Sequence, residues 1–162
     1  MCDRRWPGGA PSAHAAGPSP HARSVEPVTS PLEPSRAPSL TTRIQTRFAD
    51  LDPLGHVNHV RYLTYMETAR VRFMHEHAGG LRGSVLVARS ECDHEHEIPA
   101  RTREVDVTVQ VERVGRTSFV VRHDLVDDGR TVAVGRVVLV AVDEHRRPRP
   151  VTEQERALLL GH

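Results

Sequence analysis

Residues 52–59 of this 162-residue chain place an acid, two imidazoles and an amide just before a stretch with helical spacing. Asp52 opens the segment, a Pro-Leu-Gly turn follows, and His56, Asn58 and His59 lead into the helical pattern. A helix start offers unpaired backbone N–H groups and a partial positive charge, which can hold an oxygen that becomes negative during a reaction. A carboxylate beside such amides suits acyl transfer, as a nucleophile or as a base that activates water.

The elements that must position this segment are a short strand before it and a helix after it. Residues 42–48, with apolar Ile44 and Phe48, predict the strand. Asn58 suits a helix N-cap, and helical spacing then continues for about 20 residues until a Gly-Gly pair at 79–80 ends it. The stripe expected to face the core comprises Leu63, Met66, Ala69 and Phe73, flanked by Tyr62 and Tyr65.

Beyond the helix the hydrophobic period falls to two, which predicts strands. The expected strands run from Val85 toward Ile98, then over residues 105–111, 118–126 and 131–142. Asp128-Gly129 is a strong two-residue hairpin signal, and Thr152 with Glu155 predicts a capped C-terminal helix over 152–160. One long helix against five antiparallel strands is an α+β fold.

Composition limits the remaining possibilities. Residues 1–39 are rich in Pro, Ala and Ser and are expected to be a disordered tail, which leaves 40–162 as one domain. A formal net charge of +1 gives no reason to expect nucleic acid, and no apolar run is long enough to cross a membrane. Lysine is absent, which excludes a phosphate-loop lysine and a Schiff-base lysine, and we expect no cofactor. Cys2 and Cys92 suggest no disulfide framework, so we expect a reducing, cytoplasmic compartment.

The eleven histidines raise the question of a metal site. His75 and His77 are two residues apart on the expected helix and therefore face apart. His94 and His96 would share one face of a strand, a geometry that can bind zinc. No third ligand is indicated by the spacing, and we expect no metal.

Three motifs are shared with a known family. Residues 48–62 match an Asp-x-x-Gly-His-Val-Asn-x-x-x-Tyr signature, residues 67–70 a Glu-x-Ala-Arg motif, and residues 114–118 an Ile-Gly-Arg-Thr-Ser hairpin. In this order the chain, from about Thr42 to Leu159, resembles the hotdog-fold acyl-CoA thioesterases of the 4-hydroxybenzoyl-CoA thioesterase-like family. The resemblance implies a curved five-stranded antiparallel sheet wrapped around one long central helix. The segment around residues 93–97 departs from that family, which usually carries a more apolar stretch there.

The resemblance also implies roles for individual residues. Asp52 would be the catalytic carboxylate, and His59 would open the helix whose amides form the oxyanion hole. The supporting residues of the loop and helix would be Gly55, His56, Asn58, Tyr62 and Glu67. Gly55 is explained by the sharp turn into the helix, and His56 and Asn58 by loop hydrogen bonds as readily as by substrate contact. Glu67 could reach the pocket, since some hotdog thioesterases use a glutamate of this helix, but we expect it to form an ion pair with Arg70.

The third motif would bind coenzyme A. Arg116, Thr117 and Ser118 would meet its phosphates, and the alternative is an ordinary hairpin turn with a solvated arginine.

The expected reaction is hydrolysis of an acyl-CoA thioester to free acid and coenzyme A. Two alternatives stay open: a non-catalytic acyl-CoA-binding or sensing hotdog protein, and a hotdog enoyl-CoA hydratase. The hydratases use an Asp followed by Asn-Pro and then His, an order that this chain lacks. A five-stranded sheet with one helix leaves an open edge, and the family covers it by pairing sheets edge to edge. We therefore expect a homodimer or a dimer of dimers (a homotetramer), with active sites at the subunit interface.

Overall fold

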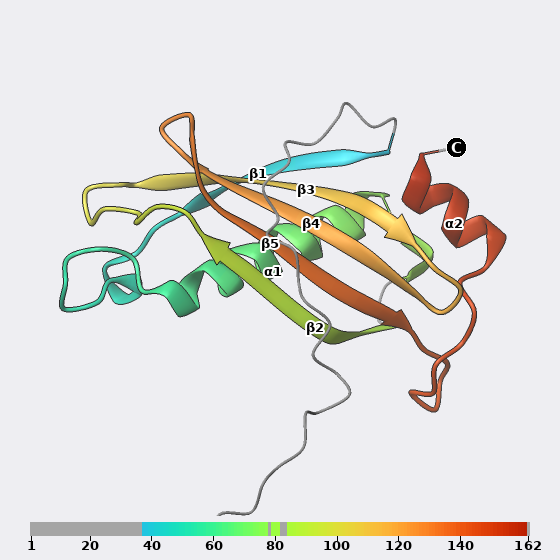
Figure 1. Ribbon diagram of the computed structural model, residues 1–162. Coiled ribbons are helices and arrows are strands. Elements are labelled where there is room, and N and C mark those ends of the chain that lie inside the picture. Colours follow the sequence, from blue (N-terminus) through green and yellow to red (C-terminus); the bar gives the residue numbers. More distant parts are fainter. Residues whose placement is uncertain (1–36, 78, 82–83, 162) are drawn as a thin grey trace, which may run out of the picture.

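The structure is a computed structural model that describes residues 37–77, 79–81 and 84–161. Most of the expected tail, including Cys2, lies outside these residues. The elements are β1 (Ser39–Gln45), the 3-10 turn η1 (Phe48–Asp50), α1 (His59–His77), the 3-10 turn η2 (Gly79–Leu81), β2 (Val85–His94), β3 (Glu104–Val114), β4 (Ser118–Asp127), β5 (Arg130–Ala141) and α2 (Glu153–Leu160). In Figure 1, α1 runs along one face of the sheet and α2 lies beside one end of it.

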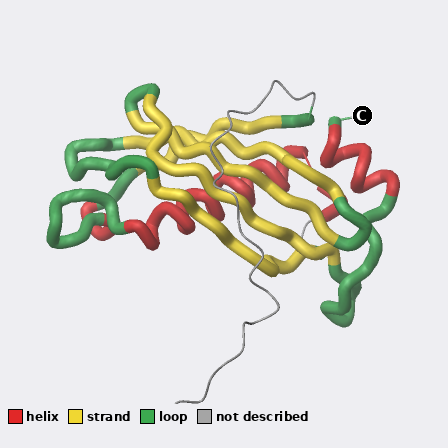
Figure 2. The backbone as a smooth tube through the Cα atoms, in the orientation of Figure 1, coloured by secondary structure: helices red, strands yellow, loops and turns green. Residues whose placement is uncertain are grey.

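The strands form one antiparallel sheet in the order β1-β3-β4-β5-β2. The strand register shifts between Val87 and Arg89 in β2 and between Val111 and Arg113 in β3. Such bulges bend a strand and increase its twist, and Figure 2 shows the strands curving over the helix. The predicted α+β hotdog fold is therefore confirmed.

Helix α1 packs one face against the sheet. Its buried residues are Tyr62, Tyr65, Met66, Ala69, Phe73 and Met74. Leu63 is 42% exposed, so the prediction that it faces the core was wrong. It lies instead on an outward-facing row of residues spaced by three or four positions, which we call the outer stripe: Val60, Leu63, Glu67 and Val71.

Helix α1 packs closely against the sheet at Gly135 of β5. A Cβ atom there would overlap the side-chain sulfur and methyl of Met66 and would lie 3.2 Å from the carbonyl oxygen of Glu91. A larger residue here would force the end of the buried Met66 side chain to move. The alternation predicted for the third strand is confirmed, because its inner valines at 105, 107, 109 and 111 are all buried.

Local signals at the chain reversals were mostly correct. Asp128 and Gly129 both have positive φ, 48° and 76°, as a tight hairpin turn with matching twist requires. Thr152 caps α2 by accepting a hydrogen bond from Glu155 N at 3.2 Å, and Glu155 Oε2 accepts one from Thr152 N at 2.8 Å. Phe48 was predicted wrongly: β1 ends at Gln45, and Phe48 lies in η1 with 92% of its surface exposed.

Candidate active site

The loop before α1 is a tight turn anchored on both sides. Asp52 N donates to His56 O at 2.9 Å, and Gly55 N donates to Asp52 O at 3.2 Å. Gly55 has a φ of 87°, which explains why glycine is needed there. Val57 N donates to Ile98 O at 2.8 Å, which attaches the loop to the segment after β2. These bonds give the Asp52 backbone a fixed position.

The Asp52 side chain is only 13% exposed and is oriented by two contacts. Its Oδ1 accepts a hydrogen bond from Leu54 N at 2.9 Å, and its Oδ2 lies 3.2 Å from Nδ1 of His56. The bond to an amide two residues on is the geometry of an Asx turn. Asp52 therefore shapes the turn and also presents a carboxylate edge beside His56.

The first turn of α1 leaves the backbone N–H of its first residue, His59, without an acceptor among the described residues. Asn58 is the N-cap, because its Oδ1 accepts from Val60 N at 3.0 Å, and Arg61 N donates to Asn58 O at 2.8 Å. The backbone N–H of His59 has no acceptor within the part of the chain that the structure describes. An unpaired amide at a helix start can stabilise an oxyanion.

These groups share a cavity of 290 Å³. Its walls are formed by Asp52, His56, Val57, His59, Tyr62 and the segment His94–Glu97. Tyr62 fixes that segment, because its hydroxyl accepts from Ile98 N at 3.0 Å and donates to His96 O at 3.2 Å. Burial raises the pKa of Tyr62, so its hydroxyl keeps its proton. Four of the residues expected from sequence, Asp52, His56, His59 and Tyr62, are thus brought together.

His94 is a member of this cavity that the motifs did not indicate. Its ring packs edge-on against Tyr62 at a centroid distance of 4.7 Å and lies 6.1 Å from the His59 ring. Burial, followed by the neighbouring imidazole of His59, lowers the pKa of His94. His94 and His96 do not share a strand face as predicted, because β2 ends at His94. Among the described residues no cluster of three or more His, Cys, Asp or Glu is placed to hold a metal ion.

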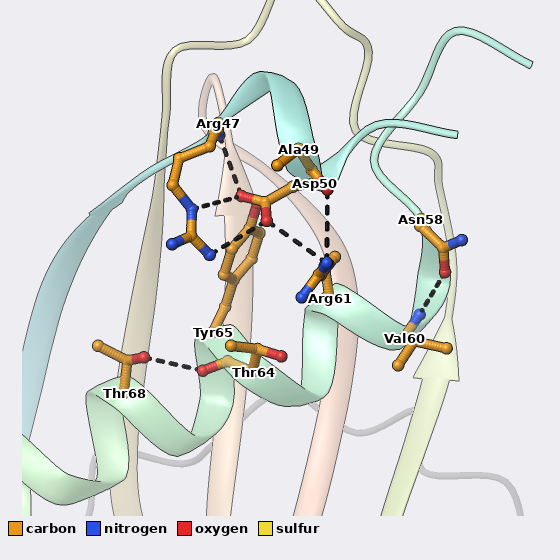
Figure 3. Close-up of polar contacts among 9 residues, drawn as sticks. All are labelled: Arg47, Ala49, Asp50, Asn58, Val60, Arg61, Thr64, Tyr65 and Thr68. Carbon is orange, nitrogen blue, oxygen red and sulfur yellow. Dashed lines mark hydrogen bonds and ion pairs between the residues drawn. The ribbon is translucent and has the colours of Figure 1, made fainter. Parts of the chain in front are cut away.

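A buried carboxylate behind the loop was missed from the sequence. Asp50 is fully buried and accepts hydrogen bonds from Arg47 N at 3.0 Å, from the Arg47 guanidinium at 3.2 Å and from the Tyr65 hydroxyl at 2.9 Å. Its carbonyl oxygen accepts from Asn58 N at 2.8 Å, and Nε of Arg61 lies 3.5 Å from its Oδ1. Figure 3 shows the side chains of Arg47, which precedes η1, and of Arg61 and Tyr65 from α1 gathered around Asp50. Asp50 therefore links η1, the N-cap and the helix.

The Asp50 cluster stays charged. Burial alone would raise the pKa of this carboxyl, but hydrogen bonds from Arg47 and Tyr65 outweigh it and hold the pKa below its ordinary value. Burial, followed by the hydrogen bond to Asp50, raises the pKa of Tyr65 above its usual range. Asp50 supports the site from behind, since it does not line the cavity.

The residues expected to bind coenzyme A lie at the other end of the sheet. Arg116 and Thr117 form the β3–β4 turn, which in Figure 1 is beside α2, and Ser118 begins β4. Val151 N donates to Arg116 O at 2.8 Å, which ties this turn to the segment before α2. Strands of this length span about 35 Å, so within one chain Arg116 and Asp52 do not form one site.

Glu67 lies outside the 290 Å³ cavity as well. It is exposed on the outer stripe, and no hydrogen bond or ion pair joins it to Arg70 in the described part of the chain. The predicted intrahelical pair is therefore not formed. Burial lowers the pKa of Arg70, and the negative charge of Glu67 offsets only part of this effect.

A curved antiparallel sheet around one helix, with an acid at the helix start, is the architecture of hotdog thioester hydrolases. The chain belongs to the thioesterase-like superfamily, because residues 46–158 match the model of that family. It is accordingly a thioester hydrolase. Comparison with curated proteins gave no match. Within the described residues, no helix combines the length and apolar character needed to span a membrane.

Solved structures agree with this family. A thioesterase from Thermus thermophilus, in complex with coenzyme A and zinc, is 36% identical and has a TM-score of 0.68, with 79% of this chain and 95% of that chain covered. A predicted thioesterase from Bacillus stearothermophilus is 26% identical and has a TM-score of 0.71, with 77% of this chain and 96% of that chain covered.

Proposed function

We propose that this enzyme hydrolyses acyl-CoA thioesters to a free acid and coenzyme A, with Asp52 as the reacting carboxylate. The observation that carries the proposal is that Asp52 and the first residue of α1, His59, line one cavity. The 36% identical thioesterase in complex with coenzyme A supports this class of substrate. An acid and a helix start that share a cavity suit a reaction in which a carbonyl oxygen becomes negative.

In the proposed reaction the thioester carbonyl lies between Asp52 and the His59 amide. If the carboxylate attacks, the C–S bond breaks, coenzyme A leaves as the thiolate, and water hydrolyses the resulting anhydride. If it acts as a base, it takes a proton from water as the water oxygen attacks, and that proton then passes to the leaving sulfur. Rapid-quench mass spectrometry separates these routes, because only the first adds the acyl mass to the peptide that contains Asp52.

The test is hydrolysis of acyl-CoA substrates of graded chain length by the parent and by Asp52→Asn. We expect the variant to lose about a hundredfold or more in kcat. Asp143→Asn is a matched control, because Asp143 also accepts a hydrogen bond from the amide two residues on, His145 N at 2.9 Å, but lies outside the cavity. An Asp52→Asn variant as active as the parent would refute the proposed role of this acid.

The two alternatives give different results in the same assay. A parent enzyme that binds acyl-CoA but releases no coenzyme A would be a binding or sensing protein. A parent that hydrates enoyl-CoA faster than it hydrolyses acyl-CoA would be a hydratase. Retained hydrolysis in the control and its loss in Asp52→Asn would favour the thioesterase over both.

The proposal includes a homodimer, or a dimer of such dimers, paired through β2. No other described strand pairs with the outer edge of β2, and Leu86 and Val87 on it are exposed. Antiparallel pairing of two copies of β2 would reverse one sheet relative to the other. The end of one sheet that carries Asp52 would then lie beside the partner's end that carries Arg116, Thr117 and Ser118.

A shared site of this kind would let one subunit hold the phosphates of a substrate cleaved by the other. Arginine suits phosphate because its fork makes paired hydrogen bonds. Arg116→Ala should then raise KM about tenfold with kcat nearly unchanged, as expected when binding is lost equally in ground and transition states. A KM equal to that of the parent would leave Arg116 as a solvated turn residue.

The cytoplasm is the compartment we propose. Cys92 supports it, because it is a free, half-buried cysteine on β2. The residues before β1, which begins at Ser39, are proposed as a tail without a role in the fold.

A further inference from the structure

A second cavity, of 420 Å³, lies between the later half of α1 and the open edge of β2. Its apolar walls include Val71 and Met74 of the helix with Leu86 and Val87 of the strand. Two charged residues, Glu67 and Arg70, also line it. None of these residues lines the cavity that holds Asp52.

Arg70 is a half-buried cation without a close partner among the described residues. No hydrogen bond or ion pair joins its guanidinium to any residue in the described part of the chain. Burial lowers its pKa, and the more distant charge of Glu67 on the same helix compensates only in part. An arginine stays charged in proteins, so burying it without a partner costs free energy.

One neighbour of Arg70 on the sheet, His123, supplies no negative charge. His123 of β4 is fully buried, and burial, followed by the positive charge of Arg70, lowers its pKa to about 3. It is therefore a neutral imidazole at physiological pH. The cavity that Arg70 lines gives an anion access to its guanidinium.

We infer that Arg70 forms an ion pair with Glu67 of a second copy of this chain, and that the two copies make this pair twice. The inference rests on the homodimer of the proposed function and adds the contact that joins its helices. In a two-fold interface, if residue i of one copy contacts residue j of the other, then j also contacts i. Glu67 and Arg70 both face the cavity, so one surface carries both members of the pair.

The spacing along α1 agrees with such an interface. Antiparallel helices that meet midway between residues 67 and 70 bring each Glu67 onto the other copy's Arg70. The same midpoint sets Leu63, which is exposed on the outer stripe, against Met74 of the other copy. A charged pair at the centre with apolar residues on either side is a self-complementary surface, and this selects a second copy over an unrelated partner.

The test uses two differently tagged variants, Glu67→Arg and Arg70→Glu, alone and mixed. Each alone places like charges opposite each other, so we expect its homodimer to weaken about tenfold or more in sedimentation experiments. Mixed, they restore opposite charges at both pairs across the interface. Native mass spectrometry should then show heterodimers well above the statistical fraction of about one half.

Controls separate this pair from other effects. Arg72→Glu mixed with Glu76→Arg is the matched control, because both residues are exposed on α1 but neither lines the cavity. We expect this mixture to give the statistical fraction. Should Arg70→Glu fail to fold, Arg70→Leu mixed with Glu67→Leu replaces it, since their heterodimer keeps one ion pair and has no unpaired charge.

The outcomes distinguish the two proposals. A parent that stays monomeric at every concentration would overturn the homodimer and this pair together. A dimeric parent whose charge-reversed variants mix statistically would overturn the pair alone. An excess of heterodimer that is absent from the control mixture would support it, because a pair within one helix could not be restored by mixing.

Discussion

Replacing Asp50 with asparagine tests whether the buried carboxylate holds the active-site loop against α1. The Arg47 side chain is 61% exposed, so its ion pair with Asp50 contributes about 0–1 kcal/mol. The bonds from Arg47 N and from Tyr65 are charge-assisted, at about 1.5–3 kcal/mol each. Asparagine can still accept one of them, so we expect a loss of about 2–3 kcal/mol in the free energy of unfolding.

Urea unfolding at neutral pH measures this loss, and acyl-CoA hydrolysis measures its effect on the site. Because Asp50 O accepts from the N-cap Asn58, we expect kcat to fall about tenfold as the helix start shifts relative to Asp52. Tyr65→Phe is the matched control. It removes one charge-assisted donor but keeps the carboxylate, so it should cost about 1.5–3 kcal/mol.

The pH dependence provides the refuting result. The folded pKa of Asp50 is lower than its ordinary value of 3.8, so the stability it contributes is present above that value and is lost as pH falls through the folded pKa. The difference between the parent and Asp50→Asn should therefore shrink below about pH 4. If the parent and Asp50→Asn differ in free energy of unfolding by the same amount at pH 7 and below pH 3, the charge of Asp50 does not hold the loop. A difference under about 0.5 kcal/mol at pH 7 would lead to the same conclusion.

Three further substitutions test the core and the β4–β5 turn. The pKa of His123 is about 3 in the folded protein and 6.5 ordinarily, so the neutral imidazole contributes its full stability above pH 6.5. As the pH falls from 6.5 toward 3, the free energy of unfolding decreases by about 1.4 kcal/mol per pH unit. The free energy of unfolding of His123→Leu, measured with urea, should therefore fall less steeply than that of the parent as the pH is lowered. Equal dependences on pH would contradict the buried neutral imidazole. Gly135→Ala should cost about 2 kcal/mol in thermal unfolding, since the added methyl overlaps Met66, and an unchanged melting temperature would count against close packing there. Gly129→Ala should cost about 1 kcal/mol through its positive φ alone, because no atom lies within 4 Å of the added methyl, and a cost as large as that at Gly135 would contradict this.

Most of the fold could be predicted because its signals are local. The alternating valines of residues 105–111, the Asp128-Gly129 turn and the capping box at Thr152 each depend on neighbours in sequence. Their geometry is set by backbone preferences that the same residues carry in any context. The motif at residues 52–59 likewise located the loop and the N-cap Asn58.

Features that depend on distant residues could not be predicted in this way. Asp50 looks like any turn acid, and Tyr65, which donates a buried hydrogen bond to it, is fifteen residues away in sequence. Leu63 has the spacing of a core residue, but the sheet covers the adjacent face of the helix. The separation of Arg116 from Asp52 within one chain follows from the strand directions, which the hairpin motif does not contain.

The strand order has a consequence for synthesis on the ribosome. β2 ends at His94, but its only described neighbour, β5, spans Arg130–Ala141 and is synthesised much later. In the same way, β1 is synthesised long before its neighbour β3. The apolar face of α1 therefore leaves the exit tunnel well before the surface that will cover it has been translated. Pairings between segments so far apart form slowly, so the growing chain exposes aggregation-prone surface until nearly its last residues are made.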